Sequence, residues 1–422
     1  MSFSELGLST ALLRATRDRD YETATPIQSA TIPVILQGRD VLASASTGSG
    51  KTAAFALPIL QRLEHEPRTA PRTTSALIVV PTRELAAQVG ESFVSYARYF
   101  EQSIKVASVF GGVSINPQMM ALRGGAEIIV ATPGRLLDLA EHNAVRLNAI
   151  RTLVLDEADR LLDLGFADEL RRVFELLPRR YQTVLCSATF PTEVDDLANR
   201  LLRDPVRIED STAESVPTIQ QRALRIDAAR RTQLLRHLIE EHKWSSVLVF
   251  VATKYATEHV AEKLRRAGID AESFHGELSQ GARTETLADF KAGKLRVVVA
   301  TDVAARGIDI KQLSAVVNYD LPRSAVDYTH RIGRTGCAGE TGIAISFVSA
   351  DSEAHLRLIE KRNSLHLPRE IIAGFEPVEP EPRNEGSASS IGGVKGKRKS
   401  KKDKLREAAA RLTADKSKPT QS

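Results

Sequence analysis

The chain has 422 residues, of which 42% are hydrophobic and 26% charged, a balance typical of soluble globular proteins and long enough for two domains. No apolar run approaches the roughly 18–20 residues needed to span a bilayer, and the first residues lack the basic and apolar regions of a secretion signal. The two cysteines, Cys186 and Cys337, exclude a disulfide framework and a cysteine-based zinc site. We therefore expect a cytoplasmic protein.

The positive charge belongs to the C-terminal end. Between Lys395 and Lys418 the chain has eleven lysines and arginines against three acids, so the rest of the chain carries a net charge of −3 out of the total +5. From residue 376 onward, proline, acids, serine and glycine precede this lysine-rich run. Such a composition predicts a disordered basic tail over residues 376–422.

Short apolar runs alternate with helical patterns along the chain. They end in small or polar residues, which is typical of buried parallel strands that lead into helices. The sequence therefore predicts an α/β fold with parallel sheets flanked by helices. The expected strands cover residues 41–43, 76–80, 128–131, 153–155 and 184–186, and then residues 247–251, 297–300, 315–317 and 343–347.

A weak internal repeat predicts two domains of similar fold. Residues 128–132 (Ile-Ile-Val-Ala-Thr) resemble residues 297–301 (Val-Val-Val-Ala-Thr), and each segment leads into a turn that contains arginine. Prolines and polar residues over 204–217 indicate a hinge. We expect a first domain over residues 1–208, a linker over 209–217 and a second domain over 218–375.

Residues 45–52 (Ala-Ser-Thr-Gly-Ser-Gly-Lys-Thr) follow an expected strand and precede an expected helix. Glycines let backbone N–H groups surround phosphate oxygens, and the helix N-terminus favours negative charge. A glycine-serine turn is the alternative, but the strand–loop–helix context favours a nucleotide-phosphate loop. The expected ligands are Ser46, Thr47, Gly48, Ser49 and Gly50, with Lys51 on the β- and γ-phosphates and Thr52 on magnesium.

Residues 154–159 (Val-Leu-Asp-Glu-Ala-Asp) carry two adjacent carboxylates where a buried strand ends. Open α/β sheets bind ligands at this edge, so Asp156 is expected to hold magnesium through water and Glu157 to polarise the attacking water. The alternative is a helix N-cap with solvated acids. The phosphate loop favours the first interpretation.

The second half of the chain contains arginines between glycines over residues 328–336. A guanidinium group matches phosphate oxygens, and an arginine supplied across a cleft can stabilise phosphoryl transfer. Arg334 is therefore a candidate catalytic residue, and His330 of the same segment is kept as a second candidate. A basic surface turn is the alternative.

Taken in order, these motifs resemble the DEAD-box family of RNA helicases. The resemblance extends over residues 1 to 375, and residues 109–125 look most like the bacterial RhlE-type subgroup. The motifs lie at residue 3 and residues 21–28, 45–52, 81–85, 111–112, 132–135, 156–159, 187–189, 247–253, 275–283, 301–309 and 330–334.

The resemblance implies two tandem RecA-like domains that close on ATP, Mg²⁺ and single-stranded RNA and locally unwind short RNA duplexes as ATP is hydrolysed. It also implies a monomer, with ribosomal precursors or RNA-decay complexes as possible partners. The basic tail is a second candidate RNA contact, or else a solubilising segment.

The resemblance also assigns residues to roles. Adenine recognition falls to Phe3, Tyr21 and Gln28, and ribose recognition to Asp309. The RNA backbone would be held by Thr82, Arg83, Gly112, Thr132, Arg135, Gln280, Arg283 and Thr301, while His330, Asp159, Ser187, Ala188 and Thr189 would couple the nucleotide site to closure.

Cys337 departs from the family pattern, because an arginine that acts on the γ-phosphate usually occupies this position. Either another arginine substitutes, with Arg331 and Arg306 nearby in sequence, or hydrolysis is slow. In the second case the protein would be an ATP-gated RNA clamp or annealing protein.

Overall fold

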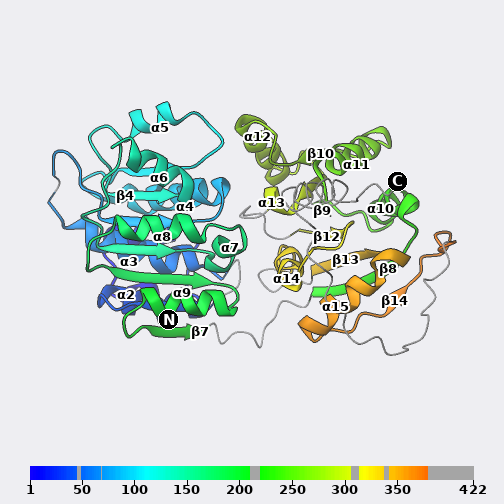
Figure 1. Cartoon of the computed structure of the whole chain (residues 1–422), viewed down its shortest axis with the longest axis horizontal. Helices are drawn as coiled ribbons and strands as arrows, with labels where there is room; N and C mark the ends of the chain where they lie inside the picture. Colours follow the sequence, from blue (N-terminus) through cyan, green and yellow to red (C-terminus); the bar gives the residue numbers. More distant parts are fainter. Residues whose placement is uncertain (45–48, 68, 210–218, 306–312, 337–341, 379–422) are drawn as a thin grey trace, which may run out of the picture. The chain divides into compact units, whose positions relative to one another are not determined.

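The computed structural model describes residues 1–44, 49–67, 69–209, 219–305, 313–336 and 342–378. These residues form two seven-stranded sheets flanked by helices (Figure 1). All strand pairings given for the two sheets are parallel. The expected α/β fold with two RecA-like sheets is therefore confirmed.

The first sheet has the strand order β3-β4-β2-β5-β6-β1-β7. Its strands are β1 (Val41–Ser44), β2 (Ala76–Val79), β3 (Val106–Val109), β4 (Ile128–Ala131), β5 (Thr152–Leu155), β6 (Gln182–Ser187) and β7 (Val206–Glu209). Its helices are α1 (Thr10–Arg17), α2 (Pro26–Leu36), α3 (Lys51–Glu64), α4 (Arg83–Tyr96), α5 (Ile115–Ala121), α6 (Pro133–Glu141), α7 (Ala158–Asp163), α8 (Ala167–Glu175) and α9 (Thr192–Leu201), with short 3-10 turns η1 (Phe3–Leu6) and η2 (Ala97–Tyr99).

The second sheet has the order β10-β11-β9-β12-β13-β8-β14. Its strands are β8 (Ile219–Arg225), β9 (Val247–Val251), β10 (Ala271–Phe274), β11 (Val297–Thr301), β12 (Ala315–Asn318), β13 (Gly342–Val348) and β14 (Arg369–Glu370). Its helices are α10 (Arg231–Glu241), α11 (Lys254–Arg266), α12 (Gln280–Lys291), α13 (Asp302–Ala305), α14 (Ala325–Ile332) and α15 (Glu353–Asn363), with 3-10 turns η4 (Ala228–Arg230) and η5 (Ala350–Ser352).

The expected strands all form, with ends within two residues of those predicted. They lie between other strands and are buried on both faces, so their sequences are continuous apolar runs. The strands that sequence patterns missed are β3, β7, β8, β10 and β14. Four of these lie at sheet edges and β8 pairs with the edge strand β14, so partial exposure leaves polar residues in their sequences.

The internal repeat is also structural. β4 and β11 each occupy the second position in their sheet, so the two similar segments perform the same role in the two halves. The predicted hinge begins too early, because β7 pairs with β1 and places residues 206–209 in the first sheet. Residues 210–217 of the expected linker, and the tail from residue 379, lie outside the described residues.

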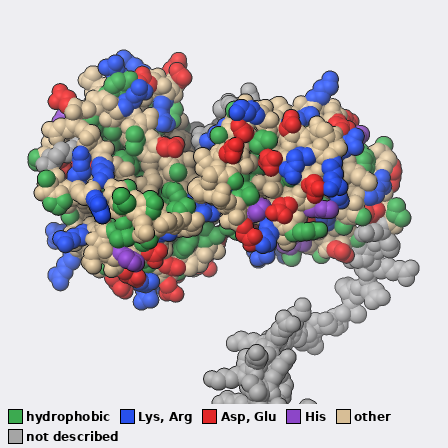
Figure 2. Space-filling model, turned by 90° about the horizontal axis from the view of Figure 1, so that it is seen from above, with side chains coloured by type: hydrophobic (Ala, Val, Ile, Leu, Met, Phe, Trp, Pro, Cys, Tyr) green, Lys and Arg blue, Asp and Glu red, His purple; other side chains and the backbone are tan. Residues whose placement is uncertain are grey.

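Figure 2 shows the charged side chains on one face of the molecule. On the face seen in Figure 2, basic and acidic side chains are interspersed rather than gathered into one patch. Among the helices in the described part of the chain, none is long and apolar enough to cross a membrane.

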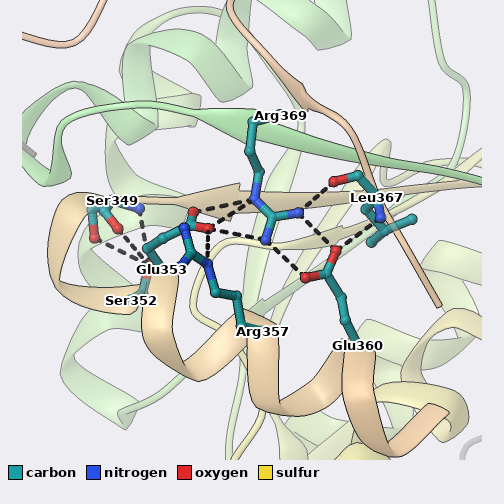
Figure 3. Close-up of polar contacts among 7 residues, drawn as sticks. All are labelled: Ser349, Ser352, Glu353, Arg357, Glu360, Leu367 and Arg369. Atoms are coloured by element: carbon teal, nitrogen blue, oxygen red, sulfur yellow. Dashed lines mark hydrogen bonds and ion pairs between the residues drawn. The ribbon is translucent and has the colours of Figure 1, made fainter. Parts of the chain in front are cut away.

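Arg369 anchors the last strand to α15 (Figure 3). Its guanidinium group donates to Glu353 Oε1 at 3.1 Å and to Glu360 Oε1 at 2.8 Å. Glu360 also accepts from the backbone N–H of Leu367 at 2.8 Å. Burial alone would raise the pKa of Glu353, but hydrogen bonds from Arg369 and Arg357 outweigh burial and lower this pKa below its ordinary value. The pKa of Glu360 is also lowered, mainly by its hydrogen bonds from Arg369.

Replacing Arg369 with alanine is expected to lower the free energy of unfolding by about 2–3 kcal/mol, because two charged acceptors lose their donor. Urea denaturation measures this change. Since the native pKa values of both glutamates are depressed, the difference from wild type should be largest above the ordinary pKa of 4.5 and fade as the pH falls below it.

Arg357→Ala is the matched control, since Arg357 is 64% exposed and its charge pairs only with Glu353 in this network. Its effect should stay within about 0.5 kcal/mol. Equal effects of the two substitutions would show that Arg369 has no special anchoring role.

Candidate nucleotide and nucleic-acid site

Three buried acids lie where β5 ends. Asp156 follows the strand, Glu157 is the N-cap residue of α7, and Asp159 lies in the first turn of that helix; their exposed fractions are 3%, 7% and 2%. The backbone of Glu157 is left-handed, with φ of 54°, a strained conformation that is common at functional sites. Glu157 is an N-cap residue, but the alternative of solvated acids is wrong, because these carboxylates are buried.

Lys51 provides positive charge to this cluster from the start of α3, where it is buried. Burial raises the pKa of Asp156 to about 6, although Lys51 opposes that shift. Burial would also raise the pKa of Glu157, but the charges of Arg160, Arg334, Lys51 and His330 outweigh it and lower the pKa. Arg160 Nη1 donates to Glu157 Oε2 at 3.2 Å.

Asp159 joins α7 to the end of β6 and to the second sheet. It accepts from the N–H and the hydroxyl of Thr189 at 3.0 and 2.8 Å, while its own N–H donates to Ser187 Oγ. His330 Nε2 of α14 lies 3.7 Å from Asp159 Oδ2, a distance for an ion pair and not for a hydrogen bond. Burial opposes ionisation of Asp159, yet His330 and Thr189 hold its pKa well below the ordinary value. Asp159 thus contacts three of the predicted coupling residues, namely Ser187, Thr189 and His330. Ala188, the remaining one, lies between Ser187 and Thr189 in the chain.

The predicted adenine-reading segment is tied to the phosphate loop. Gln28 Oε1 accepts from the N–H of Thr25 at 2.9 Å, and Gln28 Nε2 donates to the carbonyl of Gly50 at 3.2 Å. The hydroxyl of Thr25 donates to the carbonyl of Ser49 at 2.9 Å. Gly50 has φ of 94°, and a Cβ there would lie 2.4 Å from Gln28 Nε2, so this approach requires glycine.

The aromatic residues expected at adenine pack on each other. The rings of Phe3 and Tyr21 are stacked with centroids 6.4 Å apart; Phe3 is buried and Tyr21 half-buried. Thr52 is half-buried in the first turn of α3. Four predicted nucleotide ligands lie outside the described residues, namely Ser46, Thr47, Gly48 and Asp309.

The RNA candidates of the first sheet lie at strand and helix ends. Thr82 and Thr132 are the N-cap residues of α4 and α6. Arg83 lies against Gly112, where a Cβ would come within 2.3 Å of Arg83 Nη1. Arg135 donates to the carbonyl of Val113 at 2.7 Å, while its buried Nη1 has no hydrogen-bond partner among the described residues. An unpartnered buried donor of this kind suits an anion such as a phosphate.

The RNA candidates of the second sheet differ in their surroundings. Gln280 begins α12, and its buried Oε1 has no hydrogen-bond partner in the described part of the chain. Thr301 ends β11 and is half-buried. Arg283 is instead paired with Glu84 of α4, with Arg283 Nη2 2.6 Å from Glu84 Oε1 and exposed side-chain fractions of 2% and 6%. The guanidinium group of Arg283 is therefore engaged by a carboxylate of α4, and its phosphate contact stays a prediction.

Arg331 does not fit as a substitute for the arginine missing at Cys337. Its Nε and Nη2 donate to Asp302 at 2.6 Å each, and its Nη1 donates to Asn318 and to the carbonyl of Asp320. These bonds commit Arg331 to the interior of the second half. Arg306 and Cys337 lie outside the described residues.

The chain matches two known family models. The first, DEAD/DEAH box helicase, matches residues 25–197, and the second, Helicase conserved C-terminal domain, matches residues 230–339. The DEAD-box ATP-dependent RNA helicase CshA of Bacillus cereus is 39% identical over 369 residues, which are 87% of this chain and 69% of that protein. The chain belongs to the DEAD-box family of ATP-dependent RNA helicases.

Other relatives of this DEAD-box helicase agree. ATP-dependent RNA helicase DeaD of Mycobacterium tuberculosis is 41% identical over 378 residues, covering 89% of this chain and 66% of that protein. Dbp5 of S. cerevisiae bound to RNA and ADP BeF3 has a TM-score of 0.77 and 34% identity, covering 88% and 95% of the two chains. Mss116p bound to ssRNA and AMP-PNP has a TM-score of 0.78 and 28% identity, covering 90% and 79%. The RhlE-type subgroup stays a prediction.

Family membership makes this protein an RNA-stimulated ATPase that binds ATP and RNA. Magnesium fits the site of this DEAD-box helicase. Among the described residues no group of three or more His, Cys, Asp and Glu side chains could enclose a metal. Nucleotide-bound Mg²⁺ usually takes one or two protein ligands together with phosphates and water, and the buried oxygens of Asp156 suit that role.

Sequence reasoning missed several residues of the DEAD-box site. Arg160 follows Glu157 by three positions, and this helical acid–base spacing could have indicated the pair. Thr25 forms a capping box with Gln28, which Thr-x-x-Gln spacing also signals. The partnership of Glu84 with Arg283 has no local signal, since 199 residues separate them.

Proposed function

We propose that residues 1–209 and 219–378 are two RecA-like domains that close on ATP, Mg²⁺ and single-stranded RNA, and that closure separates a few base pairs of a short duplex. One observation carries the proposal: among the acids that follow β5 of the first half, Asp159 lies 3.7 Å from His330 of α14 in the second half, and the charge of Arg334 acts on Glu157. A site built from both sheets is complete only when they are together, so ligands that complete it favour closure.

Within this site Lys51 and Thr52 hold the phosphates and magnesium, together with Asp156. Magnesium, when bound, screens the charge that develops on the phosphates. Glu157 orients the attacking water and accepts its proton, since its low pKa keeps it charged at neutral pH. Arg334, whose charge reaches Glu157, stabilises the transferred phosphoryl group. Phe3, Tyr21, Gln28 and Asp309 recognise the nucleoside.

The RNA backbone is held by the strand-end residues of both domains. Arg135 supplies an unused buried donor for a phosphate, and Gln280 supplies an unused acceptor that suits a ribose 2′-hydroxyl. Contacts of this kind hold RNA without reading its sequence. Thr82, Arg83, Gly112, Thr132 and Thr301 complete this set.

The test is steady-state ATP hydrolysis with and without single-stranded RNA, with DNA of matching sequence as the control. We expect strong stimulation by RNA alone, and strand separation of a short duplex in a single-turnover assay. Hydrolysis that ignores RNA would contradict the proposal. We also propose a cytoplasmic monomer that acts on ribosomal precursors or in RNA decay.

Cys337 favours a second candidate function, an ATP-gated RNA clamp or annealing protein. The usual arginine is absent and Arg331 is committed to Asp302. In that case ATP would tighten RNA binding while turnover stayed negligible.

We expect Cys337→Arg to raise the RNA-stimulated turnover number, because a second guanidinium group would stabilise the transition state. Arginine fingers contribute on the order of 10³–10⁵ in rate elsewhere, which sets an upper bound for the gain. Cys337→Lys serves as the control for charge without the planar fork. An unchanged or lower rate for the arginine variant would mean that the position is already compensated.

A further inference from the structure

Tyr255 stands apart from the other aromatic residues of the chain. All phenylalanines, tyrosines and the tryptophan lie in the described residues, and every one except Tyr255 is buried or half-buried. The Tyr255 side chain is 71% exposed. Its ring stacks on His259 one helical turn later, with centroids 5.7 Å apart and planes at 12°. The pair forms a flat aromatic surface on α11.

The sheet places this surface beside the RNA candidates of the second half. β10, β11 and β9 are adjacent parallel strands, and the last register pair of β11 and β9 joins Thr301 to Val251. Gln280 begins α12 soon after β10 ends, and Tyr255 lies in the first turn of α11 soon after β9 ends. All three residues therefore lie at the same edge of the sheet.

Two contacts hold α11 against the loop that leads to Gln280. Lys254 Nζ is 2.5 Å from Glu277 Oε1, and His275 Nε2 is 3.2 Å from Glu258 Oε1. Helices α11 and α12 both lie beside β10 (Figure 1). These contacts place the aromatic surface beside the loop that leads to α12.

We propose that Tyr255, supported by His259, is a stacking platform for one unpaired base of the RNA strand, and this inference rests on the RNA-binding function proposed above. The charged neighbours of the ring already have partners. Lys254 is paired with Glu277 and Glu258 faces His275, so the surface offers a strand chiefly the flat aromatic face, which suits a base.

Single abasic substitutions along a short single-stranded RNA test the platform, with binding measured in the presence of a non-hydrolysable ATP analogue. Tyr255→Ala is expected to weaken binding of intact RNA by about five- to tenfold, the lower part of the range for one stacked base. At one position along the strand, removing the base should weaken RNA binding by the wild-type protein by the same five- to tenfold. Removing that base should not change the RNA affinity of Tyr255→Ala. The dependence of affinity on salt should not change, because no phosphate contact is lost.

Tyr255→Phe keeps the ring and should bind like the wild type. Leu358→Ala, at another exposed apolar residue of the second half, is the matched control and should have no effect. If Tyr255→Ala binds RNA as tightly as the wild type, the platform is overturned while the proposed function stands. The same holds if the variant loses the same affinity for intact RNA and for every abasic RNA. If the wild type binds no RNA with the analogue, both are overturned.

Discussion

Replacing Glu157 with glutamine is expected to lower RNA-stimulated ATP hydrolysis by about 100- to 10,000-fold while binding of ATP and RNA is retained. Glutamine has the same shape as glutamate but cannot accept a proton from water. The backbone strain at Glu157 and its bond from Arg160 show that the fold holds this carboxylate in one place. Single-turnover hydrolysis measures the chemical step, and equilibrium binding of RNA with an ATP analogue checks that closure survives.

Glu175→Gln is the matched control, because Glu175 lies on α8 and 64% of its side chain is exposed. It should hydrolyse ATP at the wild-type rate. If Glu157→Gln lost RNA binding together with hydrolysis, the residue would be structural and the assignment as general base would fail.

Breaking the pair of Glu84 and Arg283 is expected to weaken RNA binding in the presence of an ATP analogue by about 3 kcal/mol, or roughly two orders of magnitude. Either Glu84→Gln or Arg283→Met leaves a buried charge without its partner. The variant that carries both substitutions should bind no worse than either single variant, because the pair acts as one unit. A double-mutant cycle of RNA affinities gives this coupling energy.

The same cycle separates two roles for Arg283. If Arg283 served only as a phosphate ligand, Glu84→Gln would leave RNA affinity unchanged or raise it by freeing the guanidinium group. Lys294→Ala provides the control, because Lys294 follows α12 with 72% of its side chain exposed and pairs with Asp289. Additive losses from the two single variants would exclude a role for the pair in joining the two halves.

Sequence alone was sufficient for the architecture and for the acidic centre. Interior strands of parallel sheets are buried on both faces, so runs such as residues 128–131 and 297–300 were visible as strands. Edge strands such as β3 and β7 have a neighbouring strand on one side only and are partly exposed. Their sequences therefore mix polar and apolar residues and contain no continuous apolar run. Because β7 has no such run, the polar composition of residues 204–217 indicates a hinge that begins inside the first sheet.

Sites whose residues are adjacent in the chain can also be predicted from the sequence. A phosphate loop needs glycines directly before a helix, and the carboxylates of Asp156 and Glu157 follow one strand, so spacing along the chain is enough to indicate both. The burial of those acids could not be read in this way, because it depends on residues such as Lys51 and Arg160 that pack around them.

Only the tertiary structure decided how distant polar groups are paired. Gln28 donates to the carbonyl of Gly50, Arg283 pairs with Glu84, and Arg331 is committed to Asp302. Each partner satisfies a buried donor or acceptor, and burial makes an unsatisfied group costly. Sequence shows which residues need a partner, whereas the fold determines which partner lies within reach.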